Sequence, residues 1–362
     1  VVRVKLHRRS HLSDILAKFM LERYGHLKYG IGAVLDLPTI VMVGRGGYDE
    51  HDPALMPDPD AVECEATLVA KDLGIADWPR LQPILQHTLA VDAKGEEKSW
   101  KRLGRLVEQM HDVYPRQPWR VEQWAYRVIE ASIEAGPAGA VGGVDRARAL
   151  AIIREAYAAI RSEFQPRARA AMDPHIEELG RAGEAKPFDF FHCVHLITLK
   201  FRRLPGAPAT EWAKDALRAV LWQQELFFRA RDGFQRAYQS ALEERIEIRG
   251  QEMFVLVIRS DLQRLHSYIN SECDRYAAIA VRRSSCHVQV FRPRRTVVRV
   301  RMAHVMALIR ATEQARCRAV ESPWDDLVAQ RCEAAGTGNW FFHQKTGNLF
   351  NSGLSGSGPA TP

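Results

Sequence analysis

The chain has 362 residues, of which 46% are hydrophobic and 26% are charged, and this composition excludes a collagen-like, low-complexity or wholly disordered protein. Lys and Arg number 51 against 44 Asp and Glu, which gives a net charge of +7. Most of the excess lies after residue 245, where there are 16 Lys or Arg and 10 Asp or Glu. No apolar run reaches the roughly 18 residues that a membrane helix requires. These features favour a polyanionic partner over a membrane.

Three regions with different patterns follow one another along the chain, and together they predict the α/β fold class. Residues 1–98 predict an α/β domain, residues 99–245 a helical region, and residues 246–362 a basic α+β domain. The expected strands are residues 1–6, 39–43, 253–258, 277–281 and 288–291. The expected helices outside the middle region are residues 14–24, 64–73, 262–270 and 302–312.

Two stretches of the helical region are similar to each other. Residues 103–111 lead through a Pro-containing turn to Trp124, and residues 190–195 lead through Pro205 and Pro208 to Trp212. They predict two helix–turn–helix units packed together, with both tryptophans as core anchors; chance similarity is the alternative. Residues 136–143 are rich in Gly and predict a flexible connector.

The helical region also contains a short stretch with two histidines and a cysteine. His192, Cys193 and His195 resemble metal ligands, but their helical spacing favours a packed helix.

Metal-capable side chains follow the expected strands and helices of residues 1–98. His7, His11 and Asp14 come after the first strand, and Asp49 and His51 come after the glycine loop at residues 44–47. Asp92 follows the next helical stretch. Imidazole and carboxylate together suit Mn, Fe or Zn, and ligands gather at the carboxyl ends of strands in open α/β sheets. The alternative is structural, because Asp14 also suits a helix start and Asp49 also suits a turn.

The order of these motifs resembles a known family. His-x3-His-x2-Asp (residues 7–14), Asp-x-His (49–51), Glu-Cys-x-Ala-Thr-Leu-Val-Ala-Lys-Asp-Leu-Gly (63–74) and Asp-x-Lys-Gly (92–95) follow one another. Near the other end stand Val-Gln-Val-Phe (288–291), Trp-Phe-Phe-His (340–343) and Gly-Asn-Leu-Phe-Asn (347–351). The chain thereby resembles the DHH-like phosphoesterase superfamily, in a bacterial and metagenomic branch similar to the MYG-type metal-dependent exonucleases.

The resemblance implies an N-terminal metal-binding domain, a C-terminal substrate-binding domain, bound Mn²⁺ and phosphodiester hydrolysis. The residues that it assigns to the metal are His7, His11, Asp14, Asp49, His51 and Asp92. Of these, Asp49, His51 and Asp92 are the expected catalytic residues. The sequence departs from the family at Ser13, where an Asp is frequent, and at residues 42–44, which read Met-Val-Gly instead of Asp-Val-Gly. A non-catalytic relative that binds nucleotide or RNA is therefore the alternative to an enzyme.

Arginine dominates one stretch of the last domain. Between residues 282 and 301 there are seven Arg and no acid. Arginine pairs with phosphate through two parallel hydrogen bonds, so a nucleic-acid or nucleotide substrate is expected. The expected substrate-binding residues are Arg292, Arg294, Arg295 and His343. The alternative is that these arginines form a solvated face that protects a sheet edge.

The sequence thus predicts a metal-dependent phosphohydrolase, a hydrolase of the phosphodiesterase or exonuclease type. The six cysteines include no CxxC pair and match no zinc module, which is typical of a protein of the reducing cytoplasm.

Overall fold

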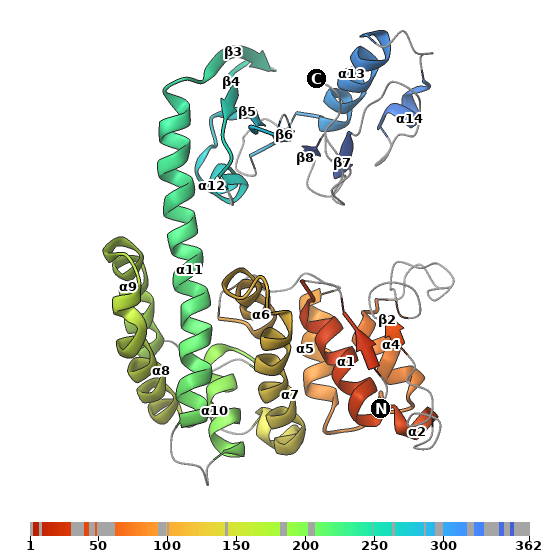
Figure 1. Ribbon diagram of the computed structural model, residues 1–362, viewed down its shortest axis with the longest axis vertical. Helices are drawn as coiled ribbons and strands as arrows, with labels where there is room; N and C mark the ends of the chain where they lie inside the picture. The colour runs from red at the N-terminus through yellow and green to blue at the C-terminus, as the bar shows by residue number, and fades with distance from the viewer. Residues whose placement is uncertain are drawn as a thin grey trace. The chain divides into compact units, whose positions relative to one another are not determined.

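A computed structural model describes residues 3–6, 9–29, 40–42, 48, 62–92, 99, 101–141, 144–181, 187–201, 207–248, 250–262, 265–285, 287–293, 300–316, 322–328, 340–343 and 348–350. These residues form a mixed structure of helices and strands, as the sequence predicts (Figure 1). The chain divides into two compact units, Val1–Gln224 and Glu225–Pro362, which we call the first and second units.

The first unit consists mostly of helices beside one short pair of strands. β1 (Arg3–Lys5) pairs in parallel with β2 (Ile40–Met42). The helices are α1 (Leu12–Tyr24), α2 (His26–Tyr29), α4 (Glu65–Asp72), α5 (Gln82–Asp92), α6 (Leu103–Val113), α7 (Pro118–Val141), α8 (Arg146–Ile160), η1 (Arg161–Glu163), α9 (Pro166–Arg181), α10 (Phe190–Lys200) and the start of α11 (Ala207–Tyr238). The expected strands and helices between residues 1 and 74 are confirmed to within three residues. In Figure 1, α1 lies between α5 and the β1–β2 pair.

One core runs through this unit. Leu16 of α1, Ile84 of α5, Val128 of α7 and Leu217 of α11 are fully buried in the same apolar cluster. The compositional change at residue 98 therefore does not separate two compact units. The second boundary also differs from the expected one at residue 245, because the division falls at Gln224, within α11.

A pair of tryptophans joins the two helical hairpins α6–α7 and α10–α11. Trp124 and Trp212 stack with their ring centroids 4.5 Å apart and their planes 7° from parallel. Each indole Nε1–H donates a hydrogen bond to the other residue's backbone carbonyl, at 3.2 Å in both directions. At the other end of the hairpins, the Leu103 N–H donates to the Phe188 carbonyl at 3.1 Å. The two similar stretches of sequence are thus two hairpins packed reciprocally, as predicted.

The histidine-rich stretch of the helical region forms a packed helix. His192 and Cys193 are buried in α10, and His192 Nδ1 accepts the Phe188 N–H at 2.7 Å, so the packed-helix interpretation is confirmed.

The expectation of a flexible connector at residues 136–143 is wrong up to Val141. The backbone leaves helical geometry only at Gly136, where φ is 64°, and α7 then continues to Val141.

The second unit is a six-stranded sheet with helices on both faces. Its elements after α11 are β3 (Leu242–Ile248), β4 (Gln251–Arg259), α12 (Leu265–Glu272), β5 (Tyr276–Arg282), β6 (Val288–Phe291), α13 (Met302–Arg316), α14 (Trp324–Val328), β7 (Phe341–His343) and β8 (Asn348–Phe350). The strand order is β3-β4-β5-β6-β8-β7. β4 and β5 are parallel, with α12 as the crossover between them, while β3–β4 and β5–β6 are antiparallel.

Alternation along the strands divides the apolar side chains of this sheet between two layers. Leu256 and Ile258 of β4 pack with Ile269 of α12 on one face. Val290 of β6 packs with Met306 of α13 on the other face. All three strands that the sequence predicts in this unit are present as β4, β5 and β6, and β6 has the predicted bounds.

Replacement of either tryptophan of the pair by Phe should destabilise the first unit. Each of Trp124→Phe and Trp212→Phe removes one buried hydrogen bond and leaves a gap, which costs about 1–3 kcal/mol of unfolding free energy. The double variant should lose less than the sum, because the first replacement already breaks the reciprocal arrangement. Urea unfolding of the four proteins measures the coupling, with Trp119→Phe on the exposed side of α7 as the control. Strictly additive losses would contradict the coupling.

Candidate functional sites

Two of the expected metal ligands lie at the start of α1. His11 precedes the first turn of the helix, and its backbone N–H donates to Asp14 Oδ2 at 2.8 Å. A carboxylate in this position satisfies an otherwise unpaired helix-terminal donor and interacts favourably with the helix dipole. Asp14 is buried, whereas the His11 side chain is 58% exposed. The helix start therefore fixes Asp14 inside the protein and leaves the imidazole accessible.

A third expected ligand reaches the same place from the end of α5. The Ser13 hydroxyl donates to Asp92 Oδ2 at 2.6 Å, and His11 Nδ1 lies 3.6 Å from Asp92 Oδ1. Asp92 is separated from His11 by about eighty residues of sequence, so the fold brings together side chains that the sequence could only list. We call His11, Asp14 and Asp92 the acid–histidine cluster.

The end of α6 holds the segment that leads into this cluster. The buried His111 donates from Nε2 to the Ser10 carbonyl at 2.9 Å. Asp112 accepts from Arg9 at 2.5 Å and from Gln223 of α11 at 2.7 Å. The residues before α1 are thus bonded to α6, and Asp112 of α6 is bonded in turn to α11.

A glycine lets α6 approach the end of α5 next to Asp92. A Cβ placed on Gly104 would lie 2.8 Å from Val91 Cγ1, closer than real Cβ contacts. Val91 precedes Asp92, and a β-branched side chain in a helix has little rotamer freedom to move away. Gly104 is therefore required by the close packing that positions Asp92.

The thiol of Cys64, whose pKa the charge of Asp92 influences, is not a nucleophile at neutral pH. Cys64 precedes α4 and is completely buried. Burial raises its pKa to about 12, with hydrogen bonds from Thr67 opposing the shift and the Asp92 charge adding to it. The uncharged thiol form is the form present in the folded protein near neutral pH.

The remaining expected ligands, His7, Asp49 and His51, lie outside the described residues. Within the described ranges, no group of three or more His, Cys, Asp or Glu side chains is arranged to hold a metal ion. The cluster does present an imidazole nitrogen and a carboxylate oxygen 3.6 Å apart on its accessible side. This pair has the donor chemistry of a Mn²⁺, Fe²⁺ or Zn²⁺ site but is only part of a ligand shell.

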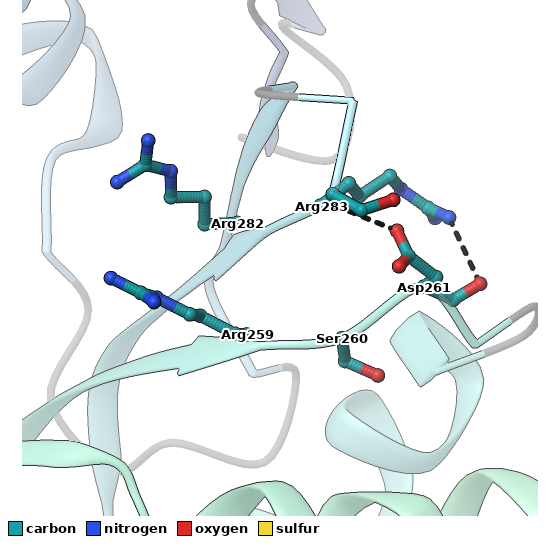
Figure 2. Close-up of a pocket in the computed structure, with 6 residues that line it drawn as sticks. Arg259, Ser260, Asp261, Arg282 and Arg283 are labelled. Atoms are coloured by element: carbon teal, nitrogen blue, oxygen red, sulfur yellow. Dashed lines mark hydrogen bonds between the residues drawn. The ribbon is translucent and has the colours of Figure 1, made fainter.

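The second unit contains a basic pocket of about 480 Å³ at the carboxyl ends of β4 and β5. We call it the arginine pocket; its lining residues are Arg259, Ser260, Asp261, Arg282, Arg283 and Ser284. Because β4 and β5 are parallel, the residues that follow both strands lie at one edge of the sheet. In Figure 2, Arg259 and Arg282 extend to the same side of the two strands.

Internal bonds shape the other half of this pocket. The Ser284 backbone N–H donates to Asp261 Oδ1 at 2.9 Å, and this hydrogen bond is the main reason that the pKa of Asp261 is lowered. Arg283 donates to the Asp261 carbonyl at 3.4 Å (Figure 2). It also donates to Gln289 Oε1 at 3.3 Å. Arg283 and Asp261 therefore fasten the two post-strand segments to each other.

The residues expected to bind substrate lie elsewhere or outside the described ranges. Arg292 follows β6 and donates to the Val300 carbonyl at 3.5 Å. It is at the opposite end of β6 from Val288, which pairs with Arg282, so it does not line the arginine pocket. His343 ends β7 opposite Asn348, while Arg294 and Arg295 lie outside the described residues.

Sequence reasoning missed Arg259 and Asp261 although a signal was present. Two apolar strands joined by a helix are each followed directly by polar residues, Arg-Ser-Asp at 259–261 and Arg-Arg-Ser at 282–284. A strand–helix–strand unit makes the strands parallel, which brings both segments to one edge. Residues 259–261 contain Asp261 and therefore form no acid-free arginine run of the kind that indicates phosphate binding.

A second pocket, of about 550 Å³, lies in the first unit beside α5. Prolines form much of its wall, with Gln82, Gln86, His87 and Arg102 as polar lining residues. The buried His87 ring stacks on Phe188 with centroids 4.8 Å apart. Burial, reinforced by the charges of Arg102 and His192, lowers the pKa of His87 to about 3, so its imidazole is neutral at physiological pH.

Comparison with known proteins finds no family model, no curated protein and no solved structure that matches this chain. Among the described residues, no helix has the length and apolar character needed to cross a membrane.

Gly104→Ala should destabilise the protein. The new methyl group collides with Val91, and overpacking of this kind costs about 1–3 kcal/mol, more than the gain in helix propensity of up to ~1 kcal/mol. The midpoint of thermal unfolding should fall, while Arg105→Ala, at a half-buried position of the same turn, should leave it nearly unchanged. An unchanged or higher midpoint for Gly104→Ala would contradict the close packing described above.

His87 should make the folded state sensitive to acid. Its folded pKa of about 3 lies below the value of 6.5 for a free histidine, so the unfolded chain binds the proton first as the pH falls. The stability contribution is complete above pH 6.5 and decreases by about 1.4 kcal/mol per pH unit between pH 6.5 and 3. Urea unfolding between pH 7.5 and 5 should therefore show a weaker pH dependence for His87→Gln than for the original protein. The exposed His26→Gln is the control, and equal slopes for all three proteins would refute the assignment.

Proposed function

We propose that the protein is a metal-dependent phosphohydrolase, of the phosphodiesterase or exonuclease type, that acts on nucleic acid or nucleotide. The observation that carries this proposal is the acid–histidine cluster, in which His11 Nδ1 and Asp92 Oδ1 lie 3.6 Å apart at the start of α1. These are residues that the resemblance to DHH-like phosphoesterases assigns to metal binding. The finer architecture that goes with it, a metal-binding first domain and a substrate-binding last domain, is part of the same proposal.

The donor chemistry of the cluster suits a Mn²⁺-type ion. His11 provides an accessible imidazole and Asp92 a carboxylate, and His7, Asp49 and His51 are the proposed further ligands. The chemistry that such an ion supplies when bound is activation of water and neutralisation of charge on a phosphate. The buried Asp14 holds the His11 backbone and thereby orients the imidazole.

Asp92 has two roles in this proposal. Its Oδ2 accepts the Ser13 hydroxyl, which fixes the orientation of the carboxylate and leaves Oδ1 directed to the His11 side. A carboxylate oriented by such a partner keeps its geometry when it binds a cation, and partners of this kind strengthen metal sites. The same negative charge helps to keep the Cys64 thiol protonated, so the thiol does not compete as a nucleophile.

The state of the cysteines in the described part of the chain agrees with a reducing compartment. Cys64, Cys193 and Cys273 are all free and buried. Thiols in this state are usual for cytoplasmic proteins, and we propose that the protein is cytoplasmic.

A second candidate function is binding of nucleotide or RNA without hydrolysis. The arginine pocket favours it, because its residues are complete within the second unit and contact with phosphate by arginine needs no metal. The missing carboxylate of the second family motif, at residues 42–44, also fits this alternative.

Asp92→Asn tests the enzyme directly. The amide keeps an acceptor for Ser13 but removes the charge that a cation needs, so Mn²⁺-dependent cleavage of a labelled oligoribonucleotide should fall roughly 100-fold or more. Elemental analysis of the purified variant should show a matching loss of bound metal.

Asp173→Asn is the matched control, because Asp173 accepts a hydroxyl from Tyr157 at 2.6 Å on a different helix, α9. Its activity should equal that of the original protein. Full cleavage by Asp92→Asn would overturn the proposed site, and absence of cleavage by the original protein would favour the binding function.

A further inference from the structure

We infer that Arg259 and Arg282 together bind one phosphate group of the substrate at the carboxyl edge of β4 and β5. The inference deepens the proposed function, and its reference to a substrate rests on that function. The binding itself is a property of the second unit and is tested without hydrolysis. It assigns substrate contact to two residues other than Arg292, Arg294 and Arg295, the arginines that the sequence analysis expects to bind substrate.

The first argument is the register of the sheet. Arg259 is the last residue of β4 and Arg282 is the last residue of β5, and the two are direct partners in the parallel pairing. Neighbouring strands lie about 4.8 Å apart, so the two side chains start close together. Both are exposed, and Figure 2 shows that they extend to the same side.

The second argument is electrostatic. Like charges placed directly opposite each other on neighbouring strands repel and destabilise the pairing. A phosphate between the two guanidinium groups changes this repulsion into attraction on both sides, because each planar fork donates two N–H groups to oxygen. Aligned arginines of this kind therefore gain stability when an anion binds.

The third argument concerns the carboxylate in the same pocket. Asp261 is the acid among the lining residues, and its Oδ1 accepts the Ser284 backbone N–H at 2.9 Å. Arg283 is directed to the Asp261 carbonyl and to Gln289. Asp261 thus organises the segment after β5, and within the described part of the chain no ion pair joins a carboxylate to Arg259 or Arg282.

The size and remaining lining of the pocket agree with a phosphate compound. A volume of about 480 Å³ is within the range of roughly 300–1,000 Å³ that is usual for small-molecule sites. Ser260 and Ser284 add hydroxyl groups, which are further donors to phosphate oxygen. None of the lining residues that the structure describes is aromatic, so we expect the pocket to bind phosphate without reading sequence.

The test is binding by the full-length protein without divalent metal. The probes are a labelled oligoribonucleotide, adenosine monophosphate and inorganic phosphate. Arg259→Gln/Arg282→Gln should weaken binding at least about tenfold, because charge-assisted hydrogen bonds are lost. The slope of log Kd against log salt for the oligonucleotide should become shallower by about 1.

Arg245→Gln/Arg316→Gln is the matched control, since it changes the net charge equally and replaces two exposed arginines of the same unit. Its affinity should stay within about twofold of the original value because only the long-range charge changes. Inorganic phosphate should raise the thermal midpoint of the original protein and of this control, but not that of the Arg259/Arg282 variant. This readout also shows that the variant folds.

The outcomes distinguish a nucleic-acid phosphate from a nucleotide phosphate, and they distinguish failure of the phosphate site from failure of the proposed hydrolysis. Arginine-dependent binding of the oligonucleotide alone identifies a nucleic-acid backbone, and equal binding of the monophosphate identifies a nucleotide; both support the site. Equal affinity of the original protein and the Arg259/Arg282 variant for all three probes would overturn it. Asp92→Asn should keep this binding, so loss of cleavage and loss of phosphate binding are distinguishable.

Discussion

The first unit depends on the stacked indoles of Trp124 and Trp212, because their mutual hydrogen bonds fix two helical hairpins that are distant in sequence. Each indole buries a large apolar ring and satisfies its one polar group on its partner's backbone, so the contact needs no other residue to complete it. Reciprocal contacts of this kind fix the relative position of two helices more tightly than apolar packing alone, since a shift of either helix breaks both hydrogen bonds. The acid–histidine cluster depends on that frame. Helix α6 belongs to the first hairpin, and its end carries His111 and Asp112, which hold the residues before α1.

How much the sequence predicts depends on how local the determining interaction is. Helix α1 and strand β6 follow from spacing within a dozen residues, and both were predicted within two residues of their observed bounds. The acid–histidine cluster was predicted as a set of residues, from motif order, but its geometry was not. The 2.6 Å hydrogen bond between Ser13 and Asp92 depends on the approach of α5 to α1, which no local pattern contains. The arginine pocket depends on the register between β4 and β5, whereas composition indicates the later arginines of the run at residues 282–301.

The differences in domain boundaries and at the glycine-rich stretch have the same origin. Composition changes near residue 245, where strands replace helices, but compactness is decided by which side chains share a core. Phe234 of α11 is buried with Leu256 and Ile279 of the sheet, so the end of that helix belongs to the second unit. Residues 136–143 suggested a linker because of their glycines, yet a single left-handed residue, Gly136, suffices for the change of direction. Composition therefore indicates where along the chain the structure changes, but it does not determine which elements form there or which core they share.

The two candidate sites make opposite electrostatic demands, which explains why they are built from different parts of the chain. A site that holds a divalent cation concentrates carboxylates such as Asp14 and Asp92, and without the cation these charges repel a phosphodiester. A site that holds phosphate by itself needs uncompensated arginine, and nearby acids reduce its affinity. If both sets lay within one small pocket, Arg259 and Arg282 would pair with the acids, and neither the cation nor the phosphate would be bound well. The cluster is built on helix termini of the first unit, and the arginine pocket is built on a parallel strand edge of the second unit. Either candidate site can therefore be altered while the other remains, so the proposed hydrolysis and the proposed phosphate binding can be tested separately.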